Sequence, residues 1–175
     1  MSKAVLVLGA ESSGNRYMTR LLISAGCDGN AEPPYEDVTP RAGVPFVWLR
    51  SVPYAQGIPD LHKLITDAQG HTDDVVAVVM LRDMYPSLMS QVKIRHAPDF
   101  ETARRRTENA LCTIFRALDQ TGIPFIPVTY SGLVNHTPDV VKWVTSELGL
   151  AMPQKLESAY DADLQWWRER EAQAR

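Results

Sequence analysis

Apolar runs divide the chain into an alternation of strands and helices. The runs that predict strands are Ala4–Leu8, Phe46–Leu49, Val75–Leu81 and Phe125–Val128. Two of them, Val5–Leu8 and Val75–Leu81, are apolar without interruption and contain many β-branched residues. This pattern is typical of strands that are buried on both faces. The sequence therefore predicts a parallel sheet that is covered by helices on both sides.

Apolar residues at helical spacing follow these runs. The stripes that predict helices lie at Tyr17–Ala25, Phe100–Leu118, Val140–Leu148 and Leu156–Trp167. Gly122 and Gly149 are expected to end the second and third of these helices. The alternation predicts a doubly wound α/β fold with three layers, α/β/α, and a mostly parallel sheet. The segment Asp28–Pro45, rich in proline, glycine and acids, is predicted to be a long loop, and such loops are often functional.

Composition indicates one globular domain, residues 1–175, with 151–175 as a helical appendage. The chain is 45% hydrophobic and 22% charged, which favours a folded rather than a disordered protein. Its net charge of -3 gives no general attraction to nucleic acid or to an anionic membrane, so neither is an expected partner. Any anion site must therefore be local.

Cysteine usage and the first residues bear on location and metal binding. The opening apolar run is too short for a signal peptide or a membrane span, so a cytoplasmic location is expected. Cys27 and Cys112 are far apart and are interpreted as reduced, small apolar residues. No set of nearby cysteines and histidines is visible, and no metal is expected. The sequence leaves the oligomeric state open.

The segment Gly9–Arg16 (Gly-Ala-Glu-Ser-Ser-Gly-Asn-Arg) joins the first strand to the first helix. A small-residue turn at this place directs backbone N–H groups and the positive end of the helix dipole at one point, which favours an anion. The spacing from Gly9 to Gly14 imitates a Walker A loop. However, Asn15 and Arg16 stand where the phosphate-binding lysine and the magnesium-binding hydroxyl would follow, which disfavours an ordinary ATPase or GTPase.

Two later segments add candidate ligands. Arg82 and Asp83 follow the third predicted strand, and Ser90 lies one or two turns into the helix after them, so that Arg82 and Ser90 can converge on one anion. The third segment begins at Phe125 and ends at Leu150, and by itself it is a strand, a turn and a helix.

Together, and in this order, the three segments resemble the sulfotransferase family, whose sulfuryl donor is 3′-phosphoadenosine 5′-phosphosulfate (PAPS) and whose fold is P-loop-like. The first resembles the 5′-phosphosulfate loop, and the second the 3′-phosphate motif, in which an arginine precedes a serine by eight residues. The third resembles the late segment that ends in Leu-Gly-Leu, here Leu148–Leu150. The resemblance implies that PAPS, or its product 3′,5′-adenosine bisphosphate (PAP), binds without a metal at Glu11, Ser12, Ser13, Gly14, Asn15, Arg16, Arg82 and Ser90. Residues 28–74 are not covered by it.

Departures from the family pattern bear on catalysis more than on fold. Ser12 stands where the family has a lysine or arginine beside the bridging oxygen, and Arg16 is the expected substitute. Asn15 and Arg16 replace a pair of threonines, which removes hydroxyl donors from the phosphate site. Ser131 replaces the glutamate of the late segment.

Candidates for the general base and the acceptor site come from the middle of the chain. The family uses a histidine or a glutamate as the base; here the candidates are His62 and Glu36, with Glu32 as a further possibility. Arg50 and Ser51, at the end of the second predicted strand, are candidate acceptor contacts, and 28–57 is expected to form the acceptor pocket. Two further features have structural interpretations: Arg104–Arg106 as a solvated charged face, and Trp166–Trp167 as the docking side of the last helix.

Three functions remain open. The first is a sulfotransferase that acts on a hydroxyl or amine acceptor. The second is a P-loop kinase relative that phosphorylates a nucleotide or small metabolite, since Val75–Leu81 followed by Asp83 faintly resembles a Walker B strand. The third is a noncatalytic domain that kept the fold and lost the reaction. The sequence does not identify the acceptor.

Overall fold

The structure, a computed structural model, describes residues 2–32, 37–53, 57–156 and 162–173. Its elements, in chain order, are β1 (Ala4–Ala10), α1 (Asn15–Ser24), β2 (Asp28–Gly29), β3 (Phe46–Val52), α2 (Leu61–Gln69), β4 (Val75–Leu81), α3 (Met84–Lys93), α4 (Phe100–Thr121), β5 (Phe125–Thr129), α5 (Tyr130–Asn135), α6 (Thr137–Leu148) and α7 (Leu164–Gln173). The strands form one parallel sheet in the order β2-β3-β1-β4-β5.

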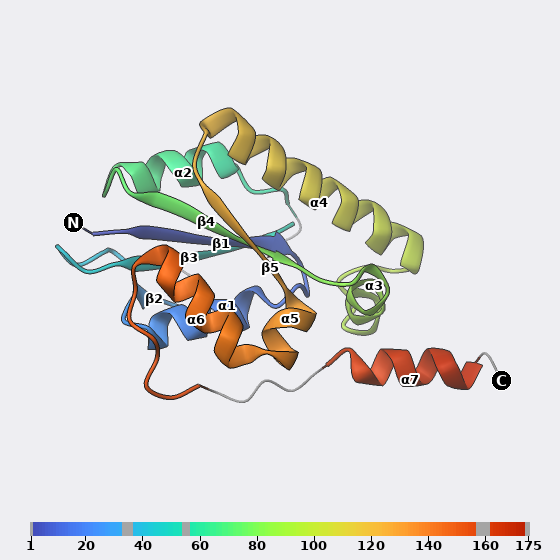
Figure 1. Cartoon of the computed structure of the whole chain (residues 1–175). Coiled ribbons are helices and arrows are strands. Elements are labelled where there is room, and N and C mark those ends of the chain that lie inside the picture. Colours follow the sequence, from blue (N-terminus) through green and yellow to red (C-terminus); the bar gives the residue numbers. More distant parts are fainter. Residues whose placement is uncertain (1, 33–36, 54–56, 157–161, 174–175) are drawn as a thin grey trace.

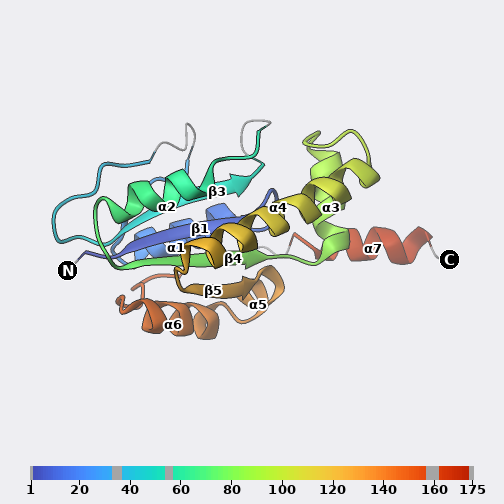
Figure 2. The ribbon, with the colours of Figure 1, turned by 90° about the horizontal axis from the view of Figure 1, so that it is seen from above.

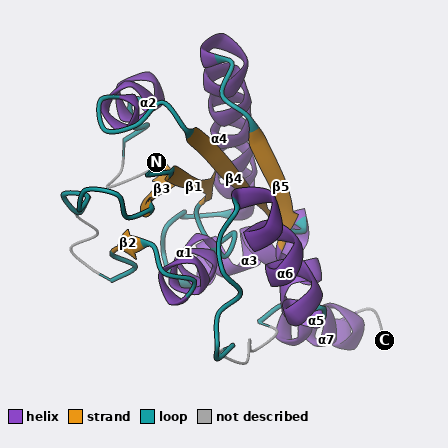
Figure 3. Cartoon of the chain, turned by 60° about the vertical axis from the view of Figure 1, so that its left-hand side comes forward, coloured by secondary structure: helices purple, strands orange, loops and turns teal. Residues whose placement is uncertain are grey.

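Helices cover both faces of this sheet, so the fold is a three-layer α/β/α sandwich (Figure 1, Figure 3). Leu6 and Leu8 of β1 pack in the cluster that includes residues of α2 and α4, whereas Val5 and Val7 pack in the cluster that includes residues of α1 and α6. Every residue of β1 is buried, because successive side chains point to opposite faces and both faces are covered. The predicted α/β architecture is therefore confirmed.

The predicted boundaries are confirmed in part. β1 and β3 each extend beyond the apolar run that predicted them, to Ala10 and Val52. The α4 and α6 helices end at glycines in the left-handed conformation, as expected: Gly122 has φ 67° and Gly149 has φ 66°. The long predicted loop contains the short strand β2, which pairs in parallel with β3. The last helix begins at Leu164, later than the pattern predicts, and residues 157–161 lie outside the described part.

The sheet order places the candidate site at one edge. β1 lies between β3 and β4 in parallel register, with Gly9 paired to Ser51 on one side and to Met80 on the other. After β1 the chain continues to β2 and β3 on one side of it, whereas after β4 it continues to β5 on the other side. The connections therefore diverge at the carboxyl ends of β1 and β4. Parallel α/β sheets bind ligands in the crevice at such a switch point. Figure 2 shows α3 and α7 beyond this end of the sheet.

Candidate functional site

The turn between β1 and α1, residues 11–14, owes its shape to close packing. A Cβ atom at Gly9 would overlap the side chains of Asn15 and Ser13 and lie 2.9 Å from the Met80 carbonyl oxygen. The Ser13 Oγ atom lies 2.6 Å from the Ala10 carbonyl oxygen and 2.9 Å from Asn15 Oδ1. Because these side chains fill the space beside Gly9, this position admits no side chain of its own.

The side-chain amide of Asn15 connects the turn to the sheet by hydrogen bonds. Its Nδ2 atom donates to the carbonyl oxygens of Gly9 and Ala10, both at 3.2 Å, and to Ser51 Oγ at 3.0 Å. Ser13 and Asn15 are 2% and 4% exposed. Their side chains therefore support the turn from beneath, and these bonds occupy the polar side-chain groups of two residues for which the sequence predicts a ligand-binding role. The Ser13 N–H group also donates within the turn, to the Ala10 carbonyl oxygen at 3.2 Å.

Two residues of the turn have the left-handed backbone conformation. Ser12 has φ 64° and Gly14 has φ 95°. A non-glycine residue in this region carries strain, which functional sites often retain. At Gly14 a Cβ atom would lie 2.7 Å from Cδ2 of Tyr130, the first residue of α5. The turn is thus shaped by contact with the late segment as well as by its own sequence.

A cleft of about 840 Å³, named here the central cleft, opens above the turn. Its lining includes Glu11, Ser12, Gly14, Asn15, Arg16, Arg82 and Ser90, which is every predicted donor-binding residue except the buried Ser13. Ser51, a predicted acceptor contact, and Tyr130 also line it. These residues come from the turn, from the start of α1, from the end of β3, from the position after β4, and from α3 and α5. The fold thus brings together segments that are far apart in the sequence.

Arg82, directly after β4, is held by partners from distant parts of the chain. Its Nε atom donates to Asp163 Oδ1 at 2.8 Å, and the two side chains are each 6% exposed. The same guanidinium donates to the Ser12 carbonyl oxygen and lies 4.7 Å from the centre of the Tyr130 ring. A cation that is buried without a partner is costly, so Asp163 stabilises Arg82 in this place.

Arg16, the predicted catalytic cation, lies at the outer edge of the central cleft. Its guanidinium pairs with Glu32 Oε2 at 2.6 Å, and its Nε atom donates to the Ala31 carbonyl oxygen at 3.2 Å. Arg20 pairs with the other oxygen of the same carboxylate. These arginines hold the pKa of Glu32 below its ordinary value, mainly through the hydrogen bond from Arg20. Glu32 is therefore a weak base, which speaks against its proposed catalytic role.

The other predicted acceptor and base residues have different positions. Arg50 pairs with Asp37 and donates to the Leu49 carbonyl oxygen, and it is absent from the lining of the central cleft. His62 lies on the exposed side of α2, where Nε2 is 2.8 Å from Gln120 Oε1 of α4, and it is absent from that lining as well. Glu36 lies outside the described residues. The site gives no structural support for His62 as a base.

A second cleft, of about 820 Å³ and named here the side cleft, lies next to the central one. Glu11 and His96 line both clefts, and the side cleft also includes Val52, Ile58, Val92, Arg95, Arg106 and Ala110. Sequence reasoning placed Arg106 on a solvated face and did not single out Arg95 or His96. The solvated face is confirmed, since Arg105 and Arg106 are exposed and Arg104 pairs with Glu101 and Glu108 at the surface. Arg106 also donates to the His96 carbonyl oxygen. Helical spacing alone did not distinguish Arg104 from Arg106.

The last helix docks beside the site. Trp166 is 3% exposed, and the Lys93 ammonium group of α3 lies 4.7 Å from the centre of its ring. The ring of Trp167 lies 5.6 Å from that of Tyr85. The predicted docking role of this tryptophan pair is confirmed for Trp166. The same docking brings Asp163 to Arg82, a contact for which the sequence offered no signal.

The fold and the site define a class of architecture: a three-layer α/β/α domain with a five-stranded parallel sheet and a cleft at the carboxyl ends of its strands. No protein-family model matches the sequence, and no curated protein matches it. Among solved structures, the chain is similar to the sulfotransferase domain from the Synechococcus PCC 7002 olefin synthase, with a TM-score of 0.56 and 13% sequence identity. The match covers 93% of this chain and 75% of that one. At this identity the likeness shows a shared fold.

None of the helices in the described ranges has the length and apolar character needed to cross a bilayer. Within the same ranges, no three histidine, cysteine, aspartate or glutamate side chains gather as a metal site would need.

Proposed function

We propose that this protein is a sulfotransferase that moves a sulfuryl group from PAPS to a hydroxyl or amine acceptor. One observation carries the proposal: the central cleft brings together the turn after β1, Arg82 after β4 and Ser90 of α3. These are the segments that resemble the donor-binding motifs of the family. The similar fold of a sulfotransferase domain supports the same function independently of those motifs.

The residues of the central cleft fit a doubly phosphorylated adenosine. The N-terminus of α1 and the positive backbone angles of Ser12 and Gly14 suit one anion, because helix N-termini and turns of this kind can present backbone N–H groups to an anion. Arg82 and Ser90 offer charged and hydroxyl donors for a second anion. Tyr130 adds an aromatic face to the lining. The cleft volume of about 840 Å³ lies within the range of small-molecule sites.

The donor, when bound, supplies the sulfuryl group and leaves as PAP. The protein's own residues would bind the two phosphates, orient the donor and stabilise the negative charge that develops on the leaving group. Hydrogen-bond donors placed in advance for such a charge contribute about 2.7–4 kcal/mol each in other enzymes. In this chain the backbone of the turn and the Arg16 guanidinium would take that role. Arg16 can do so because it lies at the edge of the same cleft.

A thermal-shift titration with PAP, in the absence of added metal, tests the proposal. Saturation at about 100 times the dissociation constant should add about 2.7 kcal/mol to the free energy of unfolding. Replacement of Ser90 by alanine should weaken this effect, whereas replacement of the exposed Arg116 on α4 should not. Transfer of labelled sulfate from PAPS to an acceptor then tests the reaction. Stabilisation by ATP with magnesium instead of PAP would indicate a kinase relative, and stabilisation by neither a noncatalytic domain.

A further inference from the structure

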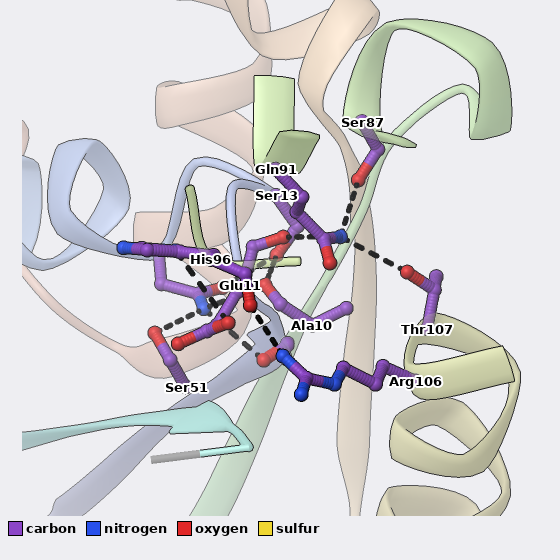
Figure 4. A network of polar contacts seen from close by, with 11 residues as sticks. Ala10, Glu11, Ser13, Ser51, Ser87, Gln91, His96, Arg106 and Thr107 are labelled. Atoms are coloured by element: carbon purple, nitrogen blue, oxygen red, sulfur yellow. Dashed lines mark hydrogen bonds and ion pairs between the residues drawn. The ribbon is translucent and has the colours of Figure 1, made fainter. Parts of the chain in front are cut away.

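Glu11 lies where the two clefts meet. It is the residue after β1, and it lines the central cleft together with the predicted donor ligands and the side cleft together with Arg95, Arg106 and Ala110. Figure 4 shows Glu11 beside His96, with Ser51 on one side and Arg106 of α4 on the other. A group at this junction can touch molecules that are bound in either cleft.

The backbone of Glu11 is held firmly. Its N–H group donates to the Val52 carbonyl oxygen at 3.3 Å, and its own carbonyl oxygen accepts from Gln91 Nε2 at 3.3 Å. Gln91 is 1% exposed, and the same Nε2 atom donates to Thr107 Oγ1 of α4 at 3.0 Å (Figure 4). This buried amide fixes the position of Glu11 between the sheet edge and two helices. Catalytic groups gain from such fixed placement.

The Glu11 carboxylate remains accessible. Its side chain is 19% exposed, and Oε2 lies 3.5 Å from His96 Nδ1, which is a loose ion pair when the imidazole is protonated. Burial raises the pKa of the Glu11 carboxyl above its ordinary value, while the positive charges of His96 and Arg106 oppose this rise. A general base is most effective when its pKa approaches the working pH, so this environment favours that role.

We propose that the side cleft is the acceptor site and that Glu11 is the general base of the reaction. The inference rests on the proposed sulfotransferase function. In the step, the acceptor oxygen forms a bond to the donor's sulfur as the bond from sulfur to the bridging oxygen breaks. The acceptor's hydroxyl proton moves to Glu11, and the bridging oxygen's electron pair leaves with PAP. Transfer between two clefts requires the base at their junction, and Glu11 meets this requirement.

The lining of the side cleft indicates the class of acceptor. Val52, Ile58, Val92 and Ala110 form an apolar wall, which suits a compact apolar body. Arg95 and Arg106 add two positive charges, and Arg95 has the left-handed φ of 60°, a strained conformation that binding sites often retain. The acceptor class is therefore a hydroxyl compound with an apolar body and an anionic group, in short an apolar hydroxy acid.

A pair of probes tests the acceptor site: 6-hydroxy-2-naphthoate and 2-naphthol, which differ by one carboxylate. Their binding to the PAP complex is measured by calorimetry. The hydroxy acid should bind at least about tenfold more tightly than naphthol, and Arg95→Ala should remove that difference. Asn109→Trp, which fills the side cleft from α4, should abolish binding of both, whereas Arg116→Trp on the same helix should not. Absence of probe binding to the wild-type complex would overturn the assignment of the cleft.

Glu11→Gln tests the base. In this proposal Glu11 acts on the acceptor and is not a ligand of the donor, which replaces the role that the sequence predicted for it. The variant keeps the shape of the side chain and should therefore retain the PAP affinity, the melting temperature and the probe affinity of the wild type. Its rate of labelled sulfate transfer to 6-hydroxy-2-naphthoate should fall by about 10²–10⁴-fold. Glu108→Gln, a surface change on α4, is the matched control and should transfer at the wild-type rate. A wild-type protein that binds both ligands without transfer, or a variant that transfers at full rate, would contradict the role of Glu11.

The two proposals fail in different ways. If PAP does not stabilise the wild-type protein, the sulfotransferase function fails, whatever the side cleft binds. If PAP binds and transfer occurs, but neither Asn109→Trp nor Glu11→Gln alters it, only the acceptor site and the base are wrong.

Discussion

The two sides of the central cleft are stabilised in different ways. On the side of the turn, Ser13 and Asn15 bond mostly to groups within six residues along the chain, and one further bond joins Asn15 to Ser51 of β3. On the other side, Arg82 is neutralised by Asp163, which is 81 residues away. The shape of the turn is thus fixed mainly by nearby groups, whereas the position of Arg82 depends on a distant segment. A bound phosphate would compete with Asp163 for Arg82 but would leave the bonds inside the turn intact.

The largest effect should come from Arg82→Ala. The change leaves the Asp163 carboxylate buried without its cation, and breaking a buried pair costs about 3–5 kcal/mol. The free energy of unfolding, measured by urea denaturation, should fall by about this amount. The PAP-induced shift should also be lost, because the cation for the second phosphate is removed.

The double variant Arg82→Ala/Asp163→Ala separates the two causes. It should recover much of the stability, because no buried charge remains, but none of the PAP binding. Recovery of PAP binding in this double variant would show that Arg82 is not a donor ligand.

The next effect should come from Gly9→Ala, which tests the local side of the comparison. A methyl group at this position would overlap the side chains of Asn15 and Ser13 and meet the Met80 carbonyl oxygen. Overpacking of this kind costs about 1–3 kcal/mol. The melting temperature should fall, and the distorted turn should lose PAP affinity. Gly26→Ala provides the control, because a Cβ atom there would meet nothing within 4 Å, although its φ of 101° carries its own strain. Equal PAP affinity in both variants would contradict the argument from packing.

The same contrast explains what the sequence could predict. The continuous apolar runs predicted β1 and β4, because strands that are buried on both faces carry apolar side chains on both. The glycines at positions 122 and 149 predicted the ends of α4 and α6. The turn was recognisable because its glycines and serines lie within six residues of the chain, from Gly9 to Gly14. Local sequence patterns of this kind predict the local structure without information about distant segments.

Contacts between distant segments could not be predicted in this way. Nothing in the sequence around Asp163 indicates that it neutralises Arg82, and the run Arg104–Arg106 gives no sign that Arg106 reaches His96 while Arg104 pairs on its own helix. Ser13 and Asn15 were predicted to contact the donor, but their side chains are occupied within the turn. Burial decides which polar group faces the cleft, and burial depends on the assembled fold.

Asp163→Asn tests whether the distant partner competes with the donor. The amide cannot neutralise Arg82, so the guanidinium should be more available to a phosphate. The affinity for PAP, measured by calorimetry, should rise about tenfold, which corresponds to 1.4 kcal/mol. Asp119→Asn, at an exposed position of α4, is the matched control and should bind PAP as the wild type does. A fall in PAP affinity for the variant at position 163 would show that Asp163 supports the donor site rather than opposing it.

The smallest effect should come from Glu32→Gln at the rim of the central cleft. Glu32 pairs with Arg16 and Arg20, but its side chain is 54% exposed, and solvent screens ion pairs of this kind. The melting temperature should stay within error of the wild type. PAP affinity should rise by about threefold or less at low salt, because Arg16 is released toward the cleft, and this gain should vanish in about 0.5 M salt. The gain from Asp163→Asn, in contrast, should persist at that salt concentration, because its pair is buried. If the gain in PAP affinity falls with salt to the same extent in both variants, the exposed Glu32 pair and the buried Asp163 pair do not differ in solvent screening, and the comparison fails.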